Sequence, residues 1–229
     1  MDERTVAVTG GTRGIGRAVV ETLLEDGTHV VTCAREADAL DALAEEFADA
    51  DGRVTTQRAD VRDEYDVERL LETAAREGGD GVDAVVANAG VYHGDPGDTP
   101  IDEESYAAFD DHCRTNARGV FAAFREAVPH LTADARLLAL SGRVAREPQP
   151  GLGSYAVSKA ATEAVARQFA ADCDPPVGVV DPGTVDTELT GGKGMDPERA
   201  APLVVWAIED ADPEVLDGGV VDRKTMRQG

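Results

Sequence analysis

Short apolar runs and amphipathic stretches alternate along this chain from one end to the other. The runs are rich in β-favouring residues and suit strands that are buried in a sheet. The stretches between them repeat their apolar positions at helical spacing, as Ile15, Val19 and Leu23 do in the first. The pattern predicts strands over 5–8, 28–33, 53–57, 81–87, 136–140, 177–180 and 219–221, and helices over 17–24, 38–47, 64–76, 105–130, 155–171 and 197–209.

Alternation of strands and helices predicts a parallel sheet of about seven strands with helices on both faces. Right-handed crossovers would make this a doubly wound, Rossmann-like α/β fold. The polar strand over 53–57 suits an edge of the sheet, and the apolar strand over 81–87 suits its centre. Because no repeat, linker or low-complexity tract interrupts the sequence, we expect one domain over 1–229.

The net charge of the chain narrows the classes of partner. There are 45 acidic and 22 basic residues, which give a formal net charge of −23. Such a chain repels phosphates, so we expect it to bind neither nucleic acid nor an anionic membrane. The acidic residues are spread over many segments rather than gathered in a tail. This favours a solvated surface adapted to high salt, as in a halophile, over an ordinary acidic cytosolic protein.

The cysteines, the histidines and the start of the chain indicate a cytoplasmic protein without a metal. Cys33, Cys113 and Cys173 are an odd number, which suits reduced thiols, and neither they nor the four histidines have metal-ligand spacing. Met1–Arg4 lacks the basic start and apolar core of a signal peptide. No apolar run approaches the ~20 residues that a membrane span needs. We therefore expect a soluble, cytoplasmic protein.

A glycine cluster lies where the first strand turns into the first helix. Gly10 permits the positive φ of a tight turn, Gly14 lets the backbone approach a ligand, and Gly16 lets helix and sheet pack closely. The N–H groups and the dipole of the new helix favour a diphosphate. The cluster alone suits an ordinary turn equally well. As a dinucleotide site it would comprise Gly10, Thr12, Arg13, Gly14, Ile15 and Gly16.

The residues after the second strand indicate which dinucleotide is bound. Where an NAD-binding protein usually offers an acid to the ribose, this chain has Ala34 and then Arg35. Arg35 and Arg13 would hold a 2′-phosphate by charge-assisted hydrogen bonds. We expect NADP(H) to be preferred, with NAD(H) as a possible second cofactor. The alternative is that both arginines are surface groups.

Two further strand ends are candidates for contact with the cofactor. Asp60 and Val61 end the third strand, where the carboxylate could accept from an adenine amino group or only cap the next element. Asn88, Ala89 and Gly90 end the fourth strand. An Asn side chain bonds readily to nearby backbone, so Asn88 suits a stabilised turn, and such a turn would support the floor of a cofactor site.

A tyrosine and a lysine open the helix predicted over 155–171. Tyr155 and Lys159 are four residues apart and share one helical face, although such a pair also occurs on exposed surfaces. A nearby ammonium favours the phenolate of a tyrosine, whose ordinary pKa is ~10, and so prepares it for acid/base work on an alcohol or carbonyl. Ser141, directly after the fifth strand, could bind a substrate oxygen. Asn116 lies inside a predicted helix, where Asn is unfavourable and needs a reason.

Together these motifs resemble the short-chain dehydrogenase/reductase family, and they follow its order over nearly the whole chain. They are Thr9-Gly10-x-x-x-Gly14-Ile15-Gly16, Asp60-Val61, Asn88-Ala89-Gly90, Asn116, Ser141, Tyr155-x-x-x-Lys159 and Pro182-Gly183-Thr184-Val185-Asp186-Thr187. Two departures concern Ser141. The stretch from Ser141 to Tyr155 is slightly longer than is usual, and the fifth strand ends in one serine where the family often has two.

The resemblance implies a role for each matching position. Tyr155 would be the acid/base and contact the cofactor, and Lys159 would lower the pKa of Tyr155 and hold the nicotinamide ribose. Ser141 would bind and polarise the substrate carbonyl, and Asn116 would support a water linked to Lys159. The segment after the sixth strand would lie along the nicotinamide, through Pro182, Gly183, Val185 and Thr187.

We therefore expect an oxidoreductase that transfers a hydride between NADP(H) and a small carbonyl or alcohol substrate. One alternative is a 3-oxoacyl-thioester reductase of the same family, although those enzymes often dock an acidic carrier on a cationic surface. Another is a non-catalytic NADP(H)-binding regulator, which would not need Tyr155 or Lys159. The family commonly assembles through the helices that carry Asn116 and Tyr155, so the resemblance also implies a homodimer or homotetramer.

Overall fold

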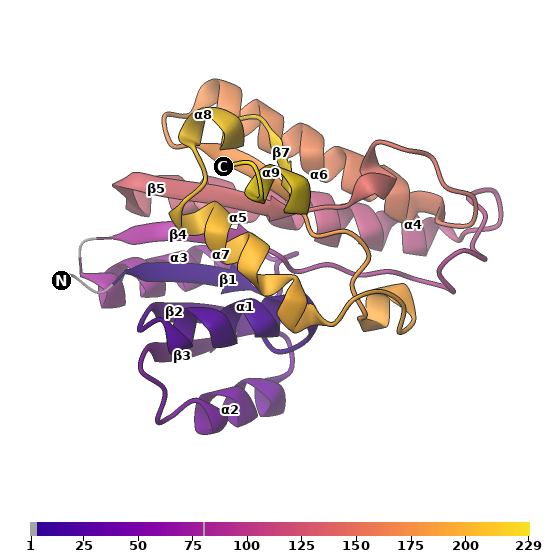
Figure 1. Cartoon of the computed structure of the whole chain (residues 1–229). Helices are drawn as coiled ribbons and strands as arrows, with labels where there is room; N and C mark the ends of the chain where they lie inside the picture. Colours follow the sequence, from indigo (N-terminus) through magenta and orange to yellow (C-terminus); the bar gives the residue numbers. More distant parts are fainter. Residues whose placement is uncertain (1–3, 80) are drawn as a thin grey trace.

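The computed structural model describes residues 4–79 and 81–229, so Met1–Glu3, on which part of the argument against a leader rests, lies outside the described residues. In this part of the chain, seven strands form one parallel sheet in the order β3-β2-β1-β4-β5-β6-β7 (Figure 1). The strands are β1 (Thr5–Thr9), β2 (His29–Ala34), β3 (Arg53–Arg58), β4 (Val82–Ala87), β5 (Leu131–Leu140), β6 (Val177–Asp181) and β7 (Val220–Asp222). The order runs outward from β1 in both directions, which confirms the predicted doubly wound, Rossmann-like fold.

Polarity along the strands matches their places in the sheet. β3, which has no fully buried residue, is an edge strand, and β4, which is buried over nearly its whole length, is the central one. Both placements agree with the expectation from the sequence. The reason is that a central parallel strand is covered on both faces and so needs apolar residues throughout.

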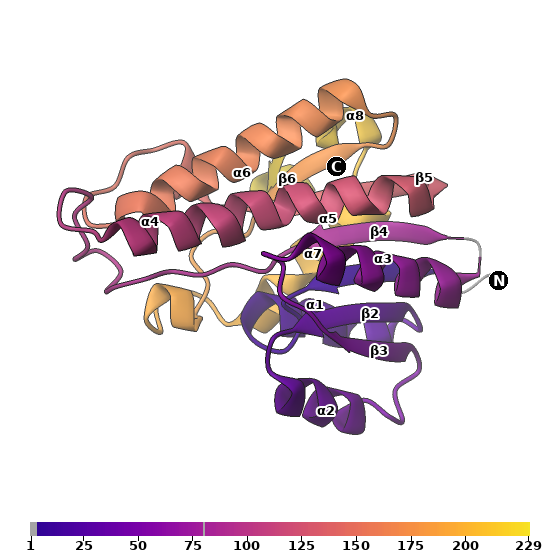
Figure 2. The same cartoon turned by 180° about the vertical axis from the view of Figure 1, so that it is seen from behind.

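Helices cover both faces of the sheet. The helices α1 (Gly14–Glu25), α2 (Ala37–Glu46) and α7 (Ala201–Glu209) pack on the face seen in Figure 1, and α3 (Glu64–Gly78), α5 (Gly119–Ala127) and α6 (Gly153–Asp172) pack on the face seen in Figure 2. Neighbouring strand residues supply the two cores alternately: Val6 and Val8 point to one, and Ala7 points to the other. Among the described helices, none combines the length and the apolar character needed to cross a bilayer.

The stretch predicted as one helix over 105–130 has four parts. It consists of α4 (Tyr106–His112), a π-helical turn over Cys113–Arg118, and α5, and it ends in a short 3-10 turn. β5 is longer than predicted, since its first half has small or polar residues in place of an apolar run and exposes Ala133 and Asp134. The hydroxyl of Thr132 in that half donates to Asp83 Oδ1 of β4 at 2.9 Å. The sequence pattern also did not predict the four-residue helices α8 (Pro213–Leu216) and α9 (Arg223–Met226).

Candidate active site

The loop between β1 and α1 adopts conformations that glycine reaches easily. Gly10 and Gly14 have φ of 72° and 54°. A Cβ on Gly16 would lie 2.2 Å from the carbonyl oxygen of Gly10, so a larger residue would displace the loop. The start of α1 has no side-chain cap and no acidic residue in its first turn. This arrangement suits an anion at the N-terminus of the helix.

Asn88 joins the end of β4 to the glycine loop. Its Nδ2 donates to the carbonyl oxygens of Thr9 at 2.9 Å and Gly10 at 3.0 Å. The backbone N–H groups of Asn88 and Ala89 both donate to Thr9 Oγ1, at 3.1 Å each. Asn88 therefore fixes the loop from the neighbouring strand, as expected of a residue that supports the floor of the site.

A cleft of about 340 Å³ opens over the glycine loop at the carboxyl ends of the strands. Most of the residues predicted to bind the cofactor line this cleft: Gly10, Thr12, Arg13, Gly14, Ile15, Arg35, Asp60, Val61, Asn88, Ala89, Gly90 and Thr187. Six predicted residues do not line it: Gly16, Tyr155, Lys159, Pro182, Gly183 and Val185. The sequence reasoning did not single out Thr115, Glu188, Leu189 or Pro197, which also line it. Thr115 precedes Asn116 and Glu188 follows Thr187, so their place beside a motif was the available signal.

Arginines gather at one end of this cleft. A second cavity of about 310 Å³ shares Arg35 and Asp60 with the cleft and is also lined by Arg58 and Arg69. Arg58 Nε donates to the carbonyl oxygen of Arg35 at 3.0 Å. Position 34 itself is Ala, but the carboxylates of Asp60 and Asp66 also line this cavity, and Asp66 is paired with Arg69. Arg35 and Arg58 are therefore the guanidinium groups that could hold a phosphate there.

Arg13, the other arginine expected at a 2′-phosphate, has a carboxylate partner. Its Nη1 lies 2.5 Å from Glu188 Oε2, and both side chains are more than half exposed. The ion pair connects the glycine loop to the segment that follows β6. Because the pair is exposed, it contributes little to stability and can exchange partners readily.

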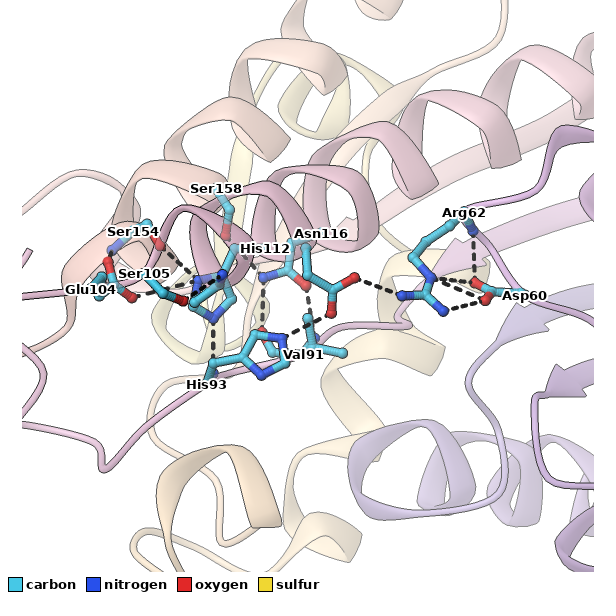
Figure 3. Close-up of polar contacts among 12 residues, drawn as sticks. Asp60, Arg62, Val91, His93, Glu104, Ser105, His112, Asn116, Ser154 and Ser158 are labelled. Carbon is cyan, nitrogen blue, oxygen red and sulfur yellow. Dashed lines mark hydrogen bonds and ion pairs between the residues drawn. The ribbon is translucent and has the colours of Figure 1, made fainter.

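Asp60 begins a series of polar contacts that leads from the cleft toward α6 (Figure 3). Arg62 Nη2 lies 2.6 Å from Asp60 Oδ2, and Arg62 Nη1 lies 2.7 Å from Asp111 Oδ1. Asp111 Oδ2 in turn lies 2.8 Å from His93 Nε2. The hydrogen bonds from Arg62 hold the pKa of Asp60 below its ordinary value. Asp60 is thus ionised at neutral pH and is already paired with a residue of its own loop.

His112, buried at the end of α4, continues this series to the first turn of α6 (Figure 3). Its Nε2 accepts from the backbone N–H of His93 at 2.9 Å, so the proton is on Nδ1, which lies 2.7 Å from Ser154 Oγ. Burial lowers the pKa of His112, which preserves the neutral form that makes both bonds. The buried carboxylate of Glu104 accepts from the backbone N–H of Ser154. The start of α6 is therefore held by two side chains from the 104–112 segment.

Tyr155 lies in that first turn, against two other rings. The ring centroids of Tyr155 and Tyr92 are 5.1 Å apart in an edge-on arrangement, and those of Tyr155 and His112 are 6.1 Å apart. Burial, with a smaller contribution from Tyr92, raises the pKa of Tyr155 to about 12. In this structure the phenol therefore keeps its proton at neutral pH.

Lys159 lies one helical turn after Tyr155. Its side chain is buried, its Nζ lies 5.9 Å from the centre of the Tyr155 ring, and it donates to the carbonyl oxygen of Leu140 at 2.9 Å. Burial lowers the pKa of Lys159 to about 8, against the opposing effect of the Glu163 carboxylate. The structure thus brings the predicted tyrosine and lysine together beside the carboxyl end of β5.

Asn116 lies in the π-helical turn, and its side chain is fully bonded. Its Oδ1 accepts from the backbone N–H of Val91 at 2.8 Å, and its Nδ2 donates to the Val91 carbonyl oxygen at 3.0 Å and to Ser158 Oγ at 2.9 Å (Figure 3). The hydroxyl of Thr162 donates to the Asn116 carbonyl oxygen at 2.6 Å. Asn116 therefore connects the loop after β4 to the face of α6 that carries Lys159.

Ser141 follows β5 as predicted, and its hydroxyl, which was expected to bind a substrate oxygen, points to a carboxylate on α6. Ser141 Oγ donates to Glu163 Oε1 at 3.0 Å. Glu163 was not singled out from the sequence, although it lies four residues after Lys159 and four before Arg167. That spacing on one helix was the signal that could have identified it.

Comparison with known proteins agrees with this fold and these motifs. The family model described as short chain dehydrogenase matches residues 4–198. The chain is 32% identical over 202 residues to NADPH-dependent aldehyde reductase 2, chloroplastic, of Arabidopsis thaliana, with 81% of this chain and 74% of that protein covered. An alcohol dehydrogenase from the archaeon Thermococcus sibiricus, solved in complex with 5-hydroxy-NADP, superposes with a TM-score of 0.85 at 27% identity, covering 96% of each chain.

The fold and the site define an α/β oxidoreductase domain of the nucleotide-binding type. The chain belongs to the short-chain dehydrogenase family. Its relatives differ in size: the chain spans only 18% of the length of glycine betaine reductase ATRR of Emericella nidulans, to which it is 30% identical over 231 residues.

Proposed function

We propose that this protein is an NADP(H)-dependent carbonyl reductase or alcohol dehydrogenase that uses Tyr155 as its acid/base. The observation that carries the proposal is the position of Tyr155 and buried Lys159 on successive turns of α6, at the same edge of the sheet as the cleft over the glycine loop. Tyr155 supplies the proton, Lys159 the nearby ammonium, and the cleft the room for a dinucleotide.

The cleft fits the proposed cofactor on three counts. The glycine loop leaves backbone close to the cleft, and the N-terminus of α1 has no acid that would repel a diphosphate. Arg35 and Arg58 surround the adjoining cavity, where a 2′-phosphate would find guanidinium partners. The Arabidopsis relative is named as NADPH-dependent, and the Thermococcus structure contains an NADP derivative.

The chemistry is divided between the cofactor and the chain. When bound, the nicotinamide exchanges a hydride with the substrate carbon. Tyr155, protonated at neutral pH, donates its proton to the carbonyl oxygen of the substrate, and in the reverse direction its phenolate form accepts the proton of the alcohol. The Lys159 ammonium stabilises the negative charge that develops on the phenol oxygen.

We propose that Ser141 contacts the substrate oxygen, with its direction set by Glu163. A hydroxyl has one proton, and that of Ser141 is donated to the carboxylate. Ser141 therefore offers lone pairs to the site and suits an O–H group of the substrate as an acceptor. Asn116 is proposed to position the site, because its side chain links the loop that contains Val91 to α6.

We also propose that the protein self-associates through α4, α5 and α6. Tyr106, Phe109, Phe121 and Val157 are exposed apolar side chains on these helices, with 92%, 41%, 43% and 40% of their surface accessible. Figure 2 shows α5 and α6 side by side, with no other element over them. An uncovered apolar face of this kind suits contact with a second copy.

Fluorescence titration with NADPH and NADH, in molar salt, tests the cofactor and the acid/base together. The wild type and Tyr155→Phe should bind NADPH alike, because Tyr155 does not line the cleft, whereas turnover of a carbonyl panel should fall by at least about 100-fold in Tyr155→Phe. Arg35→Asp should weaken NADPH much more than NADH, since only NADPH carries the 2′-phosphate.

Three outcomes would contradict the proposal. A folded wild type that binds neither nucleotide removes the argument from the glycine loop. Turnover that survives in Tyr155→Phe removes the acid/base assignment. If Arg35→Asp weakens the binding of both nucleotides equally, Arg35 does not contact the 2′-phosphate. Arg199→Asp is the control, because it changes the charge equally and lies outside the linings of both cavities.

A further inference from the structure

Glu163 is a buried carboxylate at the middle of α6. Only 2% of its side chain is exposed, which is rare for a carboxylate without partners. Ser141 donates to its Oε1 at 3.0 Å, and Arg146 Nη1 lies 3.5 Å from the same oxygen. Arg167 Nη1 lies 3.8 Å from Oε2. The carboxylate is therefore paired with cations and fixed in direction.

The partners of Glu163 adjoin the partners of Lys159. Lys159 donates to the carbonyl oxygen of Leu140, and the next residue, Ser141, donates to Glu163. Lys159 and Glu163 thus hold two successive residues at the carboxyl end of β5 from two successive turns of one helix. At this spacing the ammonium and the carboxylate share one side of α6, in a buried setting where charges interact strongly.

We propose that Glu163 is a positioning residue for the reaction: its carboxylate fixes the Ser141 hydroxyl and supplies the counter-charge that keeps the buried Lys159 ammonium protonated. The proposal rests on the proposed function, in which Lys159 acts as a cation beside Tyr155. Tyr155 transfers the proton, and Glu163 acts on the reaction only through Ser141 and Lys159.

Other charges face this pair from two directions. Arg146, from the segment after β5, contacts both Glu163 and Asp181 at the end of β6, so its charge is shared with a second acid. Arg167 is on α6 itself and is 55% exposed, so water screens it. Glu163 is accordingly the charge that opposes the effect of burial on the pKa of Lys159.

The lysine content of the chain allows a direct test. The sequence has three lysines, Lys159, Lys193 and Lys224, so labelling the lysine ε-carbons with ¹³C gives three NMR signals. The signal that is lost in Lys159→Met belongs to Lys159. The wild type should titrate at Lys159 well below an exposed lysine. Glu163→Gln, which removes the charge and keeps the shape, should lower that midpoint by about one pH unit.

Two further variants control the test. Glu147→Gln removes an exposed carboxylate that pairs with Arg143, and should leave the Lys159 midpoint unchanged. Arg167→Gln removes a half-exposed cation next to Glu163, tolerates substitution for that reason, and should raise the midpoint by a fraction of a pH unit. Opposite shifts from Glu163→Gln and Arg167→Gln support the proposal, and the second variant suffices where the first does not fold.

The alkaline limb of kcat/KM for carbonyl reduction should move in the same direction as each NMR midpoint. An unchanged Lys159 midpoint in the folded variants overturns the proposal and leaves Glu163 a structural partner of Ser141 and Arg146. The NMR measurement needs neither cofactor nor substrate. A wild type that binds no nicotinamide nucleotide would therefore refute the proposed function separately, whatever the titration shows.

Discussion

Lys159 makes the stability of this protein depend on pH in the alkaline range. Its pKa is about 8 in the folded chain, against an ordinary value of 10.5. Between these two values the unfolded chain holds a proton that the folded chain has released. Folding is then favoured by deprotonation, so this residue makes the free energy of unfolding rise as pH rises from about 8 toward 10.5, and contributes no pH dependence below that window.

Lys159→Met should remove this rise. Urea denaturation at several pH values between 7 and 10 should show the wild type gaining about 2 kcal/mol relative to the variant across the range. The comparison cancels the opposing effect of Cys33, whose raised pKa weakens folding at high pH in both proteins. Lys193→Met, at an exposed lysine, should parallel the wild type. Parallel curves for wild type and Lys159→Met would contradict the low pKa.

Local spacing revealed some of the site residues and concealed others. Tyr155 and Lys159 could be found because they are four residues apart on one helix, and Asn116 because its residue type is unfavourable there. The spacing of Glu163 from Lys159 and Arg167 was a signal of the same kind, but it did not decide between burial and solvent, because a carboxylate in an alanine-rich helix suits solvent equally well. Its burial depends on Arg146 and the end of β5, which approach α6 only in the folded chain.

At the scale of elements, the uncovered faces of α5 and α6 form one surface. Phe121 of α5 packs edge-on against Phe169 of α6, with ring centroids 5.8 Å apart, and still exposes 43% of its surface. A monomer would leave this apolar area in water, which is unfavourable in proportion to the area. Contact with a second copy would remove it.

Phe121→Glu should therefore shift the protein toward monomers in sedimentation velocity. The new carboxylate would be buried against its symmetry mate, at a cost of several kcal/mol for an unpaired charge. Tyr65→Glu makes the same change at an exposed aromatic on α3, outside the apolar set proposed for the interface, and should leave the oligomeric state as in the wild type. Identical sedimentation of all three proteins would argue against this interface.

Helices and strands could be predicted where the spacing of apolar residues indicates them. They could not be predicted where a tertiary contact determines the local structure. The strands and most helices follow from apolar spacing alone. The π-helical turn over Cys113–Arg118 does not, because it accompanies the bonds of Asn116 to Val91, a residue in another loop. The first half of β5 was missed for a similar reason: its pairing with β4 relies on polar groups such as Thr132.

At the scale of the whole molecule, the net charge of −23 sets the response to salt. Repulsion among so many excess acidic groups opposes the compact state, and salt screens it. Salt also weakens surface ion pairs such as Arg13 with Glu188, but exposed pairs contribute little. The net effect of salt should therefore be to stabilise the fold.

Raising KCl from 0.1 M to 2 M, about a fivefold contraction of the screening length, should raise the midpoint of thermal unfolding by several degrees. Sucrose serves as the control, because it is excluded from protein surfaces without screening charge. If KCl lowers the unfolding midpoint or leaves it unchanged, or if sucrose raises it equally, the result contradicts adaptation of this surface to high salt.

The cleft over the glycine loop draws its walls from nearly the entire polypeptide, from Gly10 through Asn88 and Thr115 to Pro197. A nascent chain emerging from the ribosome therefore lacks a binding site until most of its length has been synthesised. Nucleotide capture would act as a late folding step, favouring the finished protein over its partly folded precursors in proportion to ligand concentration. During starvation for the nucleotide, newly made copies would be the ones most exposed to proteases.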